Sequence, residues 1–313
     1  KVYKVKNTKN GEIYAAKISF TPLSDSLLDV HTLSREVNIL SKINHPSIVK
    51  FIGFSPINFS FEPNPVILTE LITNGTLFDI IDLTRKSLSS PKWDDTHKLI
   101  NIYGIASAMS YLHSHQTIHR DLKPSNILMN EYLFPKVADF GLSKIIHSKE
   151  ESVSLATTST SIIGTPLYIA PEIYLKKEYT TACDVYSFGI IVYEITTFLE
   201  PFKNKSLFEI AFDVTNGVRP IIDDFVPDAY RNLIEKCWAQ DPKERPTFDQ
   251  IVTEIKNNKE FITEQVDETI FLDYVDFIDT YPKEFNSKKQ IIQLDEFIKS
   301  KTKKFEKISI KDL

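Results

Sequence analysis

The residues of this chain with the clearest chemical potential lie between Ile118 and Gly141. This stretch contains the run His119-Arg120-Asp121-Leu122-Lys123-Pro124-Ser125-Asn126 and, further on, Asp139-Phe140-Gly141. These two motifs bring together two carboxylates, an amide, a lysine and an arginine. Such a set could hold a metal-bound triphosphate and orient a hydroxyl toward it, because carboxylate and amide oxygens bind Mg²⁺ and cations offset phosphate charge.

The spacing H-R-D-L-x-x-x-N followed by D-F-G matches a signature of protein kinases, and the chain resembles a eukaryotic protein kinase domain. The resemblance implies an α+β fold of two lobes, with a small antiparallel-sheet N-lobe and a mostly helical C-lobe. It places the N-lobe at residues 1–72 and the C-lobe at residues 73–256, followed by a helical, charged C-terminal tail at 257–313.

The resemblance also implies a role for each polar side chain of the two motifs. Asp121 would accept the proton of the substrate hydroxyl or orient that hydroxyl, and Lys123 would offset the charge of the γ-phosphate. Asn126 and Asp139 would bind Mg²⁺. The alternative is that these are turn-forming Asp and Asn residues, which explains any single residue but not the set.

The elements that would position ATP begin at the N-terminus. Two strand-like runs, Val2–Lys6 and Glu12–Ile18, are joined through Asn10-Gly11, a strong hairpin signal because both residue types tolerate positive φ. The second run ends in Ala15-Ala16-Lys17-Ile18, which is similar to the kinase sequence V-A-I-K. Lys17 would therefore reach the α- and β-phosphates, and an ordinary surface lysine is the alternative.

Residues 27–43 have the apolar spacing of a helix that carries Glu36, and strands are expected at Ile48–Phe54 and Val66–Leu71. By resemblance, Glu36 would pair with Lys17, although a solvated helix charge is the alternative for any lone Glu. The backbone after the last strand would bind adenine. The resemblance thus assigns nucleotide contacts to Val2, Ala15, Lys17, Thr69, Glu70, Ile72, Leu128 and Asp139.

Residues Asp184–Phe198 are apolar on every side of a predicted helix, so this helix must be buried all round. Asp184 could be its N-cap, and in the family the matching Asp bonds the catalytic-loop backbone; both roles can hold together. Further helices are expected at 96–115, 206–216, 228–239, 247–256 and 261–281, with capping boxes at Ser206/Glu209 and Thr247/Gln250.

Individual residues on these helices have expected partners. His113 and His115 lack a third metal ligand nearby, so a structural or solvated role is expected. Cys237 is expected to pack in the core, and Arg245 matches the family's arginine that pairs with Glu172.

Two segments indicate the substrate class by resemblance. Lys123-Pro124-Ser125 and the segment from Gly164 to Glu172 look like those of Ser/Thr kinases, with Thr165 as the expected partner of Asp121 and Lys123. The segment Val185–Ile190 and Cys237-Trp238 have the character of tyrosine kinases. This mixture resembles the tyrosine kinase-like group, whose members mostly phosphorylate Ser and Thr.

Regulation of activity is expected around Arg120. A phosphate group on the segment Ser148–Ser161 could form an ion pair with this cation. Thr160 and Ser161 have the best position for such a phosphorylation. The alternative is a flexible, hydroxyl-rich loop that does not regulate the enzyme. Leu40, Phe51, His119 and Phe140 occupy positions where the family forms an apolar column, or they are four unrelated core residues.

Composition limits the other possibilities. A net charge of -5 argues against a dedicated nucleic-acid binder, and no apolar run is long enough for a membrane span. Two cysteines are too few for a disulfide framework, so a cytoplasmic location is expected. Because the chain starts at Lys1, it is expected to be part of a longer protein with possible additional domains.

The glycine-rich loop of the family is missing, since Val2 matches its final valine. A natural chain that begins here would favour an inactive kinase-like scaffold, whereas a longer parent chain would favour an active enzyme with ATP and Mg²⁺ that acts on protein substrates. The segment Ala170-Pro171-Glu172 argues against a third possibility, a kinase that acts on small molecules.

Overall fold

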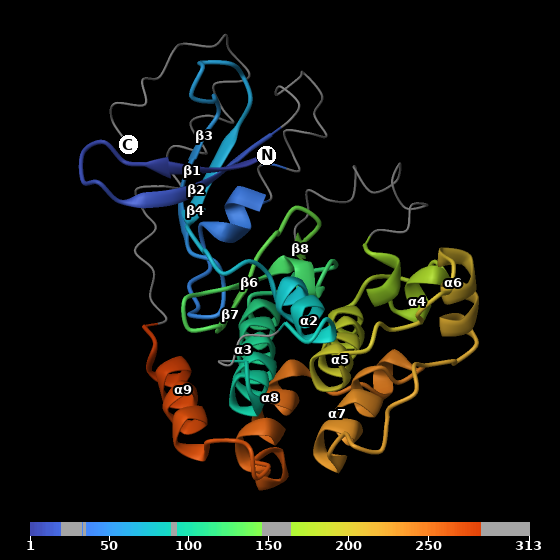
Figure 1. Cartoon of the computed structure of the whole chain (residues 1–313). Helices are drawn as coiled ribbons and strands as arrows, with labels where there is room; N and C mark the ends of the chain where they lie inside the picture. Colours follow the sequence, from blue (N-terminus) through green and yellow to red (C-terminus); the bar gives the residue numbers. More distant parts are fainter. Residues whose placement is uncertain (20–32, 34–35, 89–92, 146–163, 283–313) are drawn as a thin grey trace. The chain divides into compact units, whose positions relative to one another are not determined.

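The computed structural model describes residues 1–19, 33, 36–88, 93–145 and 164–282. The chain divides into two compact units, one containing residues 1–44 and 49–72, the other containing residues 45–48 and 73–281 (Figure 1). The first unit is built around a small antiparallel sheet and the second is mainly helical, so the predicted α+β fold is confirmed.

The sheet of the first unit has the strand order β1-β2-β4-β3. Its strands are β1 (Val2–Lys6), β2 (Ile13–Ile18), β3 (Phe51–Ser55) and β4 (Val66–Glu70), all paired antiparallel. The predicted hairpin is confirmed, because Gly11 has a φ of 78° and its amide donates to the Asn7 carbonyl at 2.9 Å. Residues 36–40 are helical, and most of the helix predicted at 27–43 lies outside the described residues.

The prediction of a strand at Ile48–Phe54 is wrong about where the strand begins. Ile48 instead forms a parallel bridge with Val137, in the second unit, and the β3 ladder starts only at Phe51. The Val137 amide donates to the Ser47 carbonyl at 2.8 Å, and this bond keeps the start of the segment out of the β3 ladder.

The second unit is organised around two long helices, α3 (Asp95–Ser114) and α5 (Thr181–Thr197). Most residues of α5 are buried, as predicted from its apolar character on all sides. The other helices are α2 (Leu77–Arg85), α4 (Pro171–Tyr174), α6 (Leu207–Thr215), α7 (Asp228–Cys237), α8 (Phe248–Asn257) and α9 (Glu268–Thr280). Two small sheets pair β5 (Thr117–Ile118) with β8 (Lys144–Ile145) and β6 (Ile127–Met129) with β7 (Pro135–Val137).

Local signals account for several helix ends. Both capping boxes are confirmed, Ser206 with Glu209 before α6 and Thr247 with Gln250 before α8. Cys237 is fully buried, as expected, and burial raises the pKa of its thiol. Among the described helices, none combines the length and the apolar character needed to cross a membrane.

The tail helix begins later than the sequence predicted. A short 3₁₀ turn at Lys259–Phe261 is followed by α9, whose N-cap Asp267 accepts a hydrogen bond from the Ile270 amide at 3.1 Å. The buried face of α9 consists of Phe271, Tyr274, Val275 and Ile278, and the helix packs against α3. This part of the tail therefore belongs to the core of the second unit.

Candidate active site

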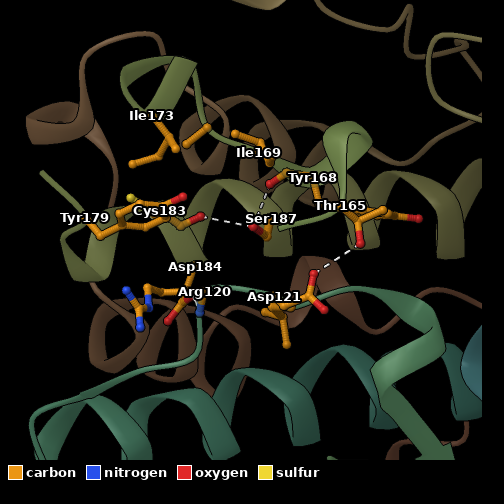
Figure 2. Close-up of a pocket in the computed structure, with 12 residues that line it drawn as sticks. Arg120, Asp121, Thr165, Tyr168, Ile169, Ile173, Tyr179, Cys183, Asp184 and Ser187 are labelled. Atoms are coloured by element: carbon orange, nitrogen blue, oxygen red, sulfur yellow. Dashed lines mark hydrogen bonds between the residues drawn. The ribbon is translucent and has the colours of Figure 1, made fainter. Parts of the chain in front are cut away.

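The carboxylate of Asp121 is held by three neighbouring side chains. Its Oδ1 accepts a hydrogen bond from the Thr165 hydroxyl at 3.1 Å (Figure 2). Its Oδ2 lies 2.8 Å from the Lys123 ammonium and accepts a hydrogen bond from Asn126 at 2.9 Å. Lys123 also donates to the Thr165 hydroxyl at 2.6 Å, so the predicted partnership of Thr165 with Asp121 and Lys123 is confirmed. The carboxylate consequently has one defined orientation.

The amide of Asn126 is also oriented. Its nitrogen donates both to the Asp121 carbonyl at 2.8 Å and to the Asp121 carboxylate, so its nitrogen is committed and its oxygen is the atom available to a cation. Asn126 lies in a 3₁₀ turn, Pro124–Asn126, and its carbonyl accepts from the Ala138 amide at 2.8 Å. This bond links the loop His119–Asn126, the expected catalytic loop, to the residue directly before Asp139.

Asp139 and Arg120 both have left-handed backbone conformations, with φ of 63° and 66°. Such values are uncommon outside glycine, and residues that adopt them cluster at functional sites. The two residues lie in the two motifs that the sequence singled out, but eight other non-glycine residues in the described part of the chain also have positive φ, so this geometry alone does not identify the site.

Asp184 anchors the catalytic loop from inside α5. Its carboxylate accepts the amides of His119 at 2.8 Å and Arg120 at 2.9 Å, and it lies 2.9 Å from His113 Nε2. Burial by itself raises the pKa of this carboxyl, but the hydrogen bond and charge of His113, together with His119, bring the pKa below its ordinary value. The predicted bond to the loop backbone is therefore confirmed.

The predicted N-cap role of Asp184 is wrong. Helix α5 begins at Thr181, so Asp184 lies inside the first turn and Thr180 occupies the N-cap position without a capping side-chain bond. This position in the first turn brings the Asp184 carboxylate next to the catalytic loop. Its oxygens therefore accept hydrogen bonds from amides of that loop instead of from amides at the start of α5.

Arg120 is half-buried and lies beside carbonyl oxygens. Its guanidinium donates to the Leu142 carbonyl at 2.6 Å and to the Ser143 carbonyl at 3.4 Å, and it lies 5.5 Å from the centre of the Tyr179 ring. The expected regulatory segment Ser148–Ser161, with Thr160 and Ser161, lies outside the described residues. Arg120, Asp121, Thr165, Tyr179 and Asp184 line one pocket (Figure 2).

The segment after Thr165 is tied to the helical core. The Glu172 carboxylate and the Arg245 guanidinium form two bonds of 2.7 and 2.8 Å, which confirms the predicted pair. Both side chains are almost completely buried, and Arg245 also donates to the carbonyls of Ala182 and Ala239 at 2.9 Å each. This pair joins α4 to the start of α5 and to the loop before α8.

Gly164 allows the chain to approach the catalytic loop closely. Its φ is 121°, and a Cβ atom at this position would lie 3.2 Å from the Arg120 carbonyl oxygen. A side chain here would therefore be strained in its backbone and crowded against the loop. The glycine places Thr165 next to Asp121.

The first unit holds the predicted site residues that precede residue 73. The Lys17 ammonium lies 2.9 Å from a carboxylate oxygen of Glu36, so the predicted pair forms. Lys17 is 44% exposed and Glu36 only 11%, which leaves the ammonium accessible to a ligand. In the sheet register, Val2 pairs with Lys17 and Ala15 pairs with Thr69. Since alternate residues of a strand share a face, all four predicted contacts lie on one face of the sheet.

Two further nucleotide contacts are backbone predictions. The Glu70 amide donates to the Lys50 carbonyl at 2.9 Å, and the Glu70 carbonyl accepts from the Thr69 hydroxyl at 3.2 Å, so the adenine contact stays a prediction. Ile72 lies two residues after the end of β4, at the end of this segment of the first unit. Leu128 is half-buried in β6 of the second unit.

One neighbouring pair of the expected apolar column is seen. The rings of His119 and Phe140 lie 5.2 Å apart in the second unit, whereas Leu40 and Phe51 are each buried in the first unit. A continuous column through all four residues stays a prediction.

Sequence reasoning missed several residues that support the site. His113 has a structural role, as expected, but its contact with Asp184 was not predicted, and neither was the bond from the Ser143 hydroxyl to the His119 carbonyl at 3.3 Å. Tyr168 donates to Glu194 at 2.7 Å, and Glu194 also pairs with Arg85 at 2.9 Å. These partners are far apart in the chain, so no local pattern could have indicated them.

Comparisons with known proteins agree with this geometry. The protein kinase domain model matches residues 1–255, and the chain belongs to this family. A putative serine/threonine-protein kinase/receptor of Acanthamoeba polyphaga mimivirus is 36% identical over 239 residues, which cover 75% of this chain and 13% of that protein.

Two Dictyostelium discoideum proteins are similarly related. A probable LIM domain-containing serine/threonine-protein kinase is 35% identical over 237 residues, covering 75% of this chain and 34% of that protein. A probable serine/threonine-protein kinase is 35% identical over 219 residues, covering 70% of this chain and 22% of that protein. The match thus spans between 13% and 34% of the length of these relatives.

Proposed function

We propose that this chain transfers the γ-phosphoryl group of ATP to serine and threonine hydroxyls of proteins, with Mg²⁺ as the metal. The observation that carries the proposal is the Asp121 carboxylate held by Thr165, Lys123 and Asn126. Phosphoryl transfer depends mainly on positioning and on neutralising charge, and this arrangement supplies both. The names of the related proteins support the same substrate class.

The donor atoms fit Mg²⁺. Asn126 offers an amide oxygen and Asp139 a carboxylate, and oxygen is the ligand that Mg²⁺ prefers. In the part of the chain that the structure describes, no three His, Cys, Asp or Glu residues gather as a metal site. Few protein ligands suit Mg²⁺, which keeps several waters and binds substrate phosphates. Bound Mg²⁺ would partly neutralise the phosphate oxygens.

Each remaining side chain has a defined task in this proposal. Asp121 orients the acceptor hydroxyl and receives its proton, and its two anchored oxygens keep it aimed. Lys123 offsets charge on the transferred phosphoryl group. Lys17, held by Glu36, binds the α- and β-phosphates. Val2, Ala15, Thr69, Glu70, Ile72 and Leu128 contact the base and sugar.

We also propose that the chain belongs to the tyrosine kinase-like group and that it acts in signalling in the cytoplasm. Support for the group comes from the mixture of Ser/Thr and tyrosine-kinase segments in the sequence. Support for the compartment comes from Cys183 and Cys237, which are both free and buried, as is common where thiols stay reduced.

The test is transfer from γ-labelled ATP to a generic basic protein by the natural full-length protein and its Asp139→Asn variant. We expect the variant to lose about 100-fold or more of the rate, because a charged metal ligand is replaced by a neutral one. Asp224→Asn, at a fully exposed carboxylate, is the matched control and should keep the wild-type rate. Absence of transfer by the wild-type protein would instead support an inactive, kinase-like scaffold.

A further inference from the structure

Helix α9 lies beyond the residues that match the protein kinase domain model, yet four of its side chains are buried in the second unit. Tyr274 is 5% exposed, and its ring lies 4.8 Å from that of Phe134 and 6.4 Å from that of Tyr103. The ring therefore contacts both α3 and the chain that leads into β7.

The hydroxyl of Tyr274 reaches a specific partner in this interior. It lies 2.9 Å from the Ser47 hydroxyl, 227 residues away in the chain. Ser47 is fully buried, so each hydroxyl is the partner that satisfies the other in a place closed to water. Burial also raises the pKa of Tyr274, which keeps the phenol protonated.

Gly104 of α3 makes room for this contact. A Cβ atom at this position would come closer than van der Waals contact to the Tyr274 hydroxyl, 2.7 Å from Pro135 Cγ and 3.2 Å from the Ser47 hydroxyl. Three segments that are distant in sequence, α9, β7 and residues 45–48, thus meet over one glycine.

From Ser47 the contacts continue toward the metal-binding motif. The Ser47 carbonyl accepts the Val137 amide at 2.8 Å, and Ile48 forms a bridge with Val137. Val137 is the last residue of β7 and stands two positions before Asp139. A short series of bonded groups therefore joins Tyr274 to the backbone that carries Asp139.

We propose that Tyr274 is a positioning residue for Asp139, acting through Ser47 and the end of β7. The hydroxyl pair holds residues 45–48 against α9, and this segment in turn holds β7 and the backbone conformation of Asp139. A helix outside the matched kinase region thereby sets how well the chain binds its metal. The inference rests on the proposed function for its effect on activity, but its structural part can be measured without activity.

The first test is Tyr274→Phe, which removes only the hydroxyl and keeps the ring. Loss of the partner of a buried hydroxyl should increase hydrogen exchange of the Val137 amide about tenfold in the free protein. The Mg²⁺ concentration for half-maximal rate should rise about tenfold, the low end for groups that support a metal ligand indirectly. Tyr132→Phe deletes the same atom from an exposed ring and should change neither quantity.

Ser47→Ala removes the other half of the pair and should reproduce both effects, and it replaces Tyr274→Phe if that variant does not fold. Unchanged Val137 exchange in either variant would overturn the inference. An inactive wild-type protein whose Tyr274→Phe variant still exchanges faster at Val137 would refute the proposed function and leave the structural link intact.

The second test uses the glycine. Gly104→Ala should raise the Mg²⁺ requirement, because the new methyl group displaces Tyr274. Adding Tyr274→Phe removes the atom with the closest clash, so the double variant should recover part of the loss, about threefold, relative to Gly104→Ala alone. Additive losses in the double variant would show that Gly104 and Tyr274 act separately and would overturn the inference.

Discussion

At the scale of residues, the catalytic loop shows how one hydroxyl can connect two charged groups. Thr165 donates to Asp121 and accepts from Lys123, so it bridges the proposed acceptor-orienting carboxylate and the cation beside it. Lys123 and Asp121 also contact directly at 2.8 Å, and the three groups form a closed arrangement. The arrangement should be sensitive to loss of the hydroxyl and insensitive to loss of the methyl group.

Thr165→Ala should therefore lower kcat about tenfold, because one positioned hydrogen bond is worth about 1.4 kcal/mol when it is lost. Thr165→Ser keeps the hydroxyl and should stay within about twofold of the wild-type rate. Steady-state kinetics with one peptide substrate measures both variants. An equal loss in the two variants would mean that the methyl group, and not the hydroxyl, is important.

Asp184 predicts a specific dependence of stability on pH. Its folded pKa lies below the ordinary carboxyl value of 3.8, so the stabilisation by its ionised form is complete well above that value and is lost as the pH falls through the lowered pKa. Asp184→Asn should cost about 3 kcal/mol of unfolding free energy near pH 7, since it removes a buried charge from its donors. The difference should become smaller only below pH 3.8.

Urea denaturation of the wild-type protein and the Asp184→Asn variant between pH 7 and about pH 3 measures this difference. Asp224→Asn, at an exposed carboxylate, is the control and should show almost no difference at any pH. A gap that already closes above pH 5 would contradict the lowered pKa.

At the scale of elements, the Glu172–Arg245 pair joins α4 to the helical core. Arg245→Met should destabilise the protein by about 3–5 kcal/mol, because Glu172 would remain as an unpaired buried charge. Lys236→Met, which breaks an exposed pair with Glu254, should cost less than about 1 kcal/mol.

Chemical denaturation of both variants gives the comparison. The double variant Glu172→Gln with Arg245→Met should be more stable than Arg245→Met alone, because no charge is left buried without a partner. Equal costs for the buried and the exposed pair would show that the burial of Arg245 has no energetic importance.

The elements also show which parts of the structure can be predicted from sequence. The two capping boxes, the hairpin at Gly11 and the buried character of α5 depend on neighbouring residues, and all were predictable. The pairs of Lys17 with Glu36 and Arg245 with Glu172 depend on distant residues and were found only through the resemblance.

Errors occurred where a distant contact overrides a local pattern. The segment at Ile48 has the composition of a strand, but its bridge with Val137 takes it out of the β3 ladder. The apolar repeat from Phe261 suggested one continuous helix, whereas Asp267 caps a new helix seven residues before Tyr274. The Ser47–Tyr274 contact has no sequence signal at all, because neither residue type is unusual.

At the scale of the whole molecule, the proposed site residues are divided between the two compact units. Val2, Ala15, Lys17 and Thr69 belong to the first, and Asp121, Asn126, Leu128 and Asp139 to the second. The proposed function requires both groups to contact one nucleotide. The match also spans only 13% and 34% of two of its relatives.

The contribution of α9 to the second unit can be measured by shortening the chain. A chain that ends at Gln265 lacks Phe271, Tyr274, Val275 and Ile278, which are buried in the longer chain. Each large apolar side chain contributes about 1.5–3 kcal/mol when buried, so we expect a loss of roughly 5 kcal/mol or more compared with a chain ending at Pro282.

Thermal unfolding of the two chains, followed by circular dichroism, measures this loss as a lower Tm. Equal Tm values would mean that α9 is dispensable for the stability of the unit.

The space above Gly104 has a consequence for the evolution of this group of proteins. Because a side chain at position 104 and the phenol of Tyr274 cannot occupy the same volume, the two positions should vary together among homologues. Loss of the phenol removes only the closest of the contacts that a Cβ atom at position 104 would make, and Pro135 must also shift before alanine fits there. Alanine at position 104 is therefore expected mainly in homologues that have a smaller residue at position 274 and a changed contact at position 135.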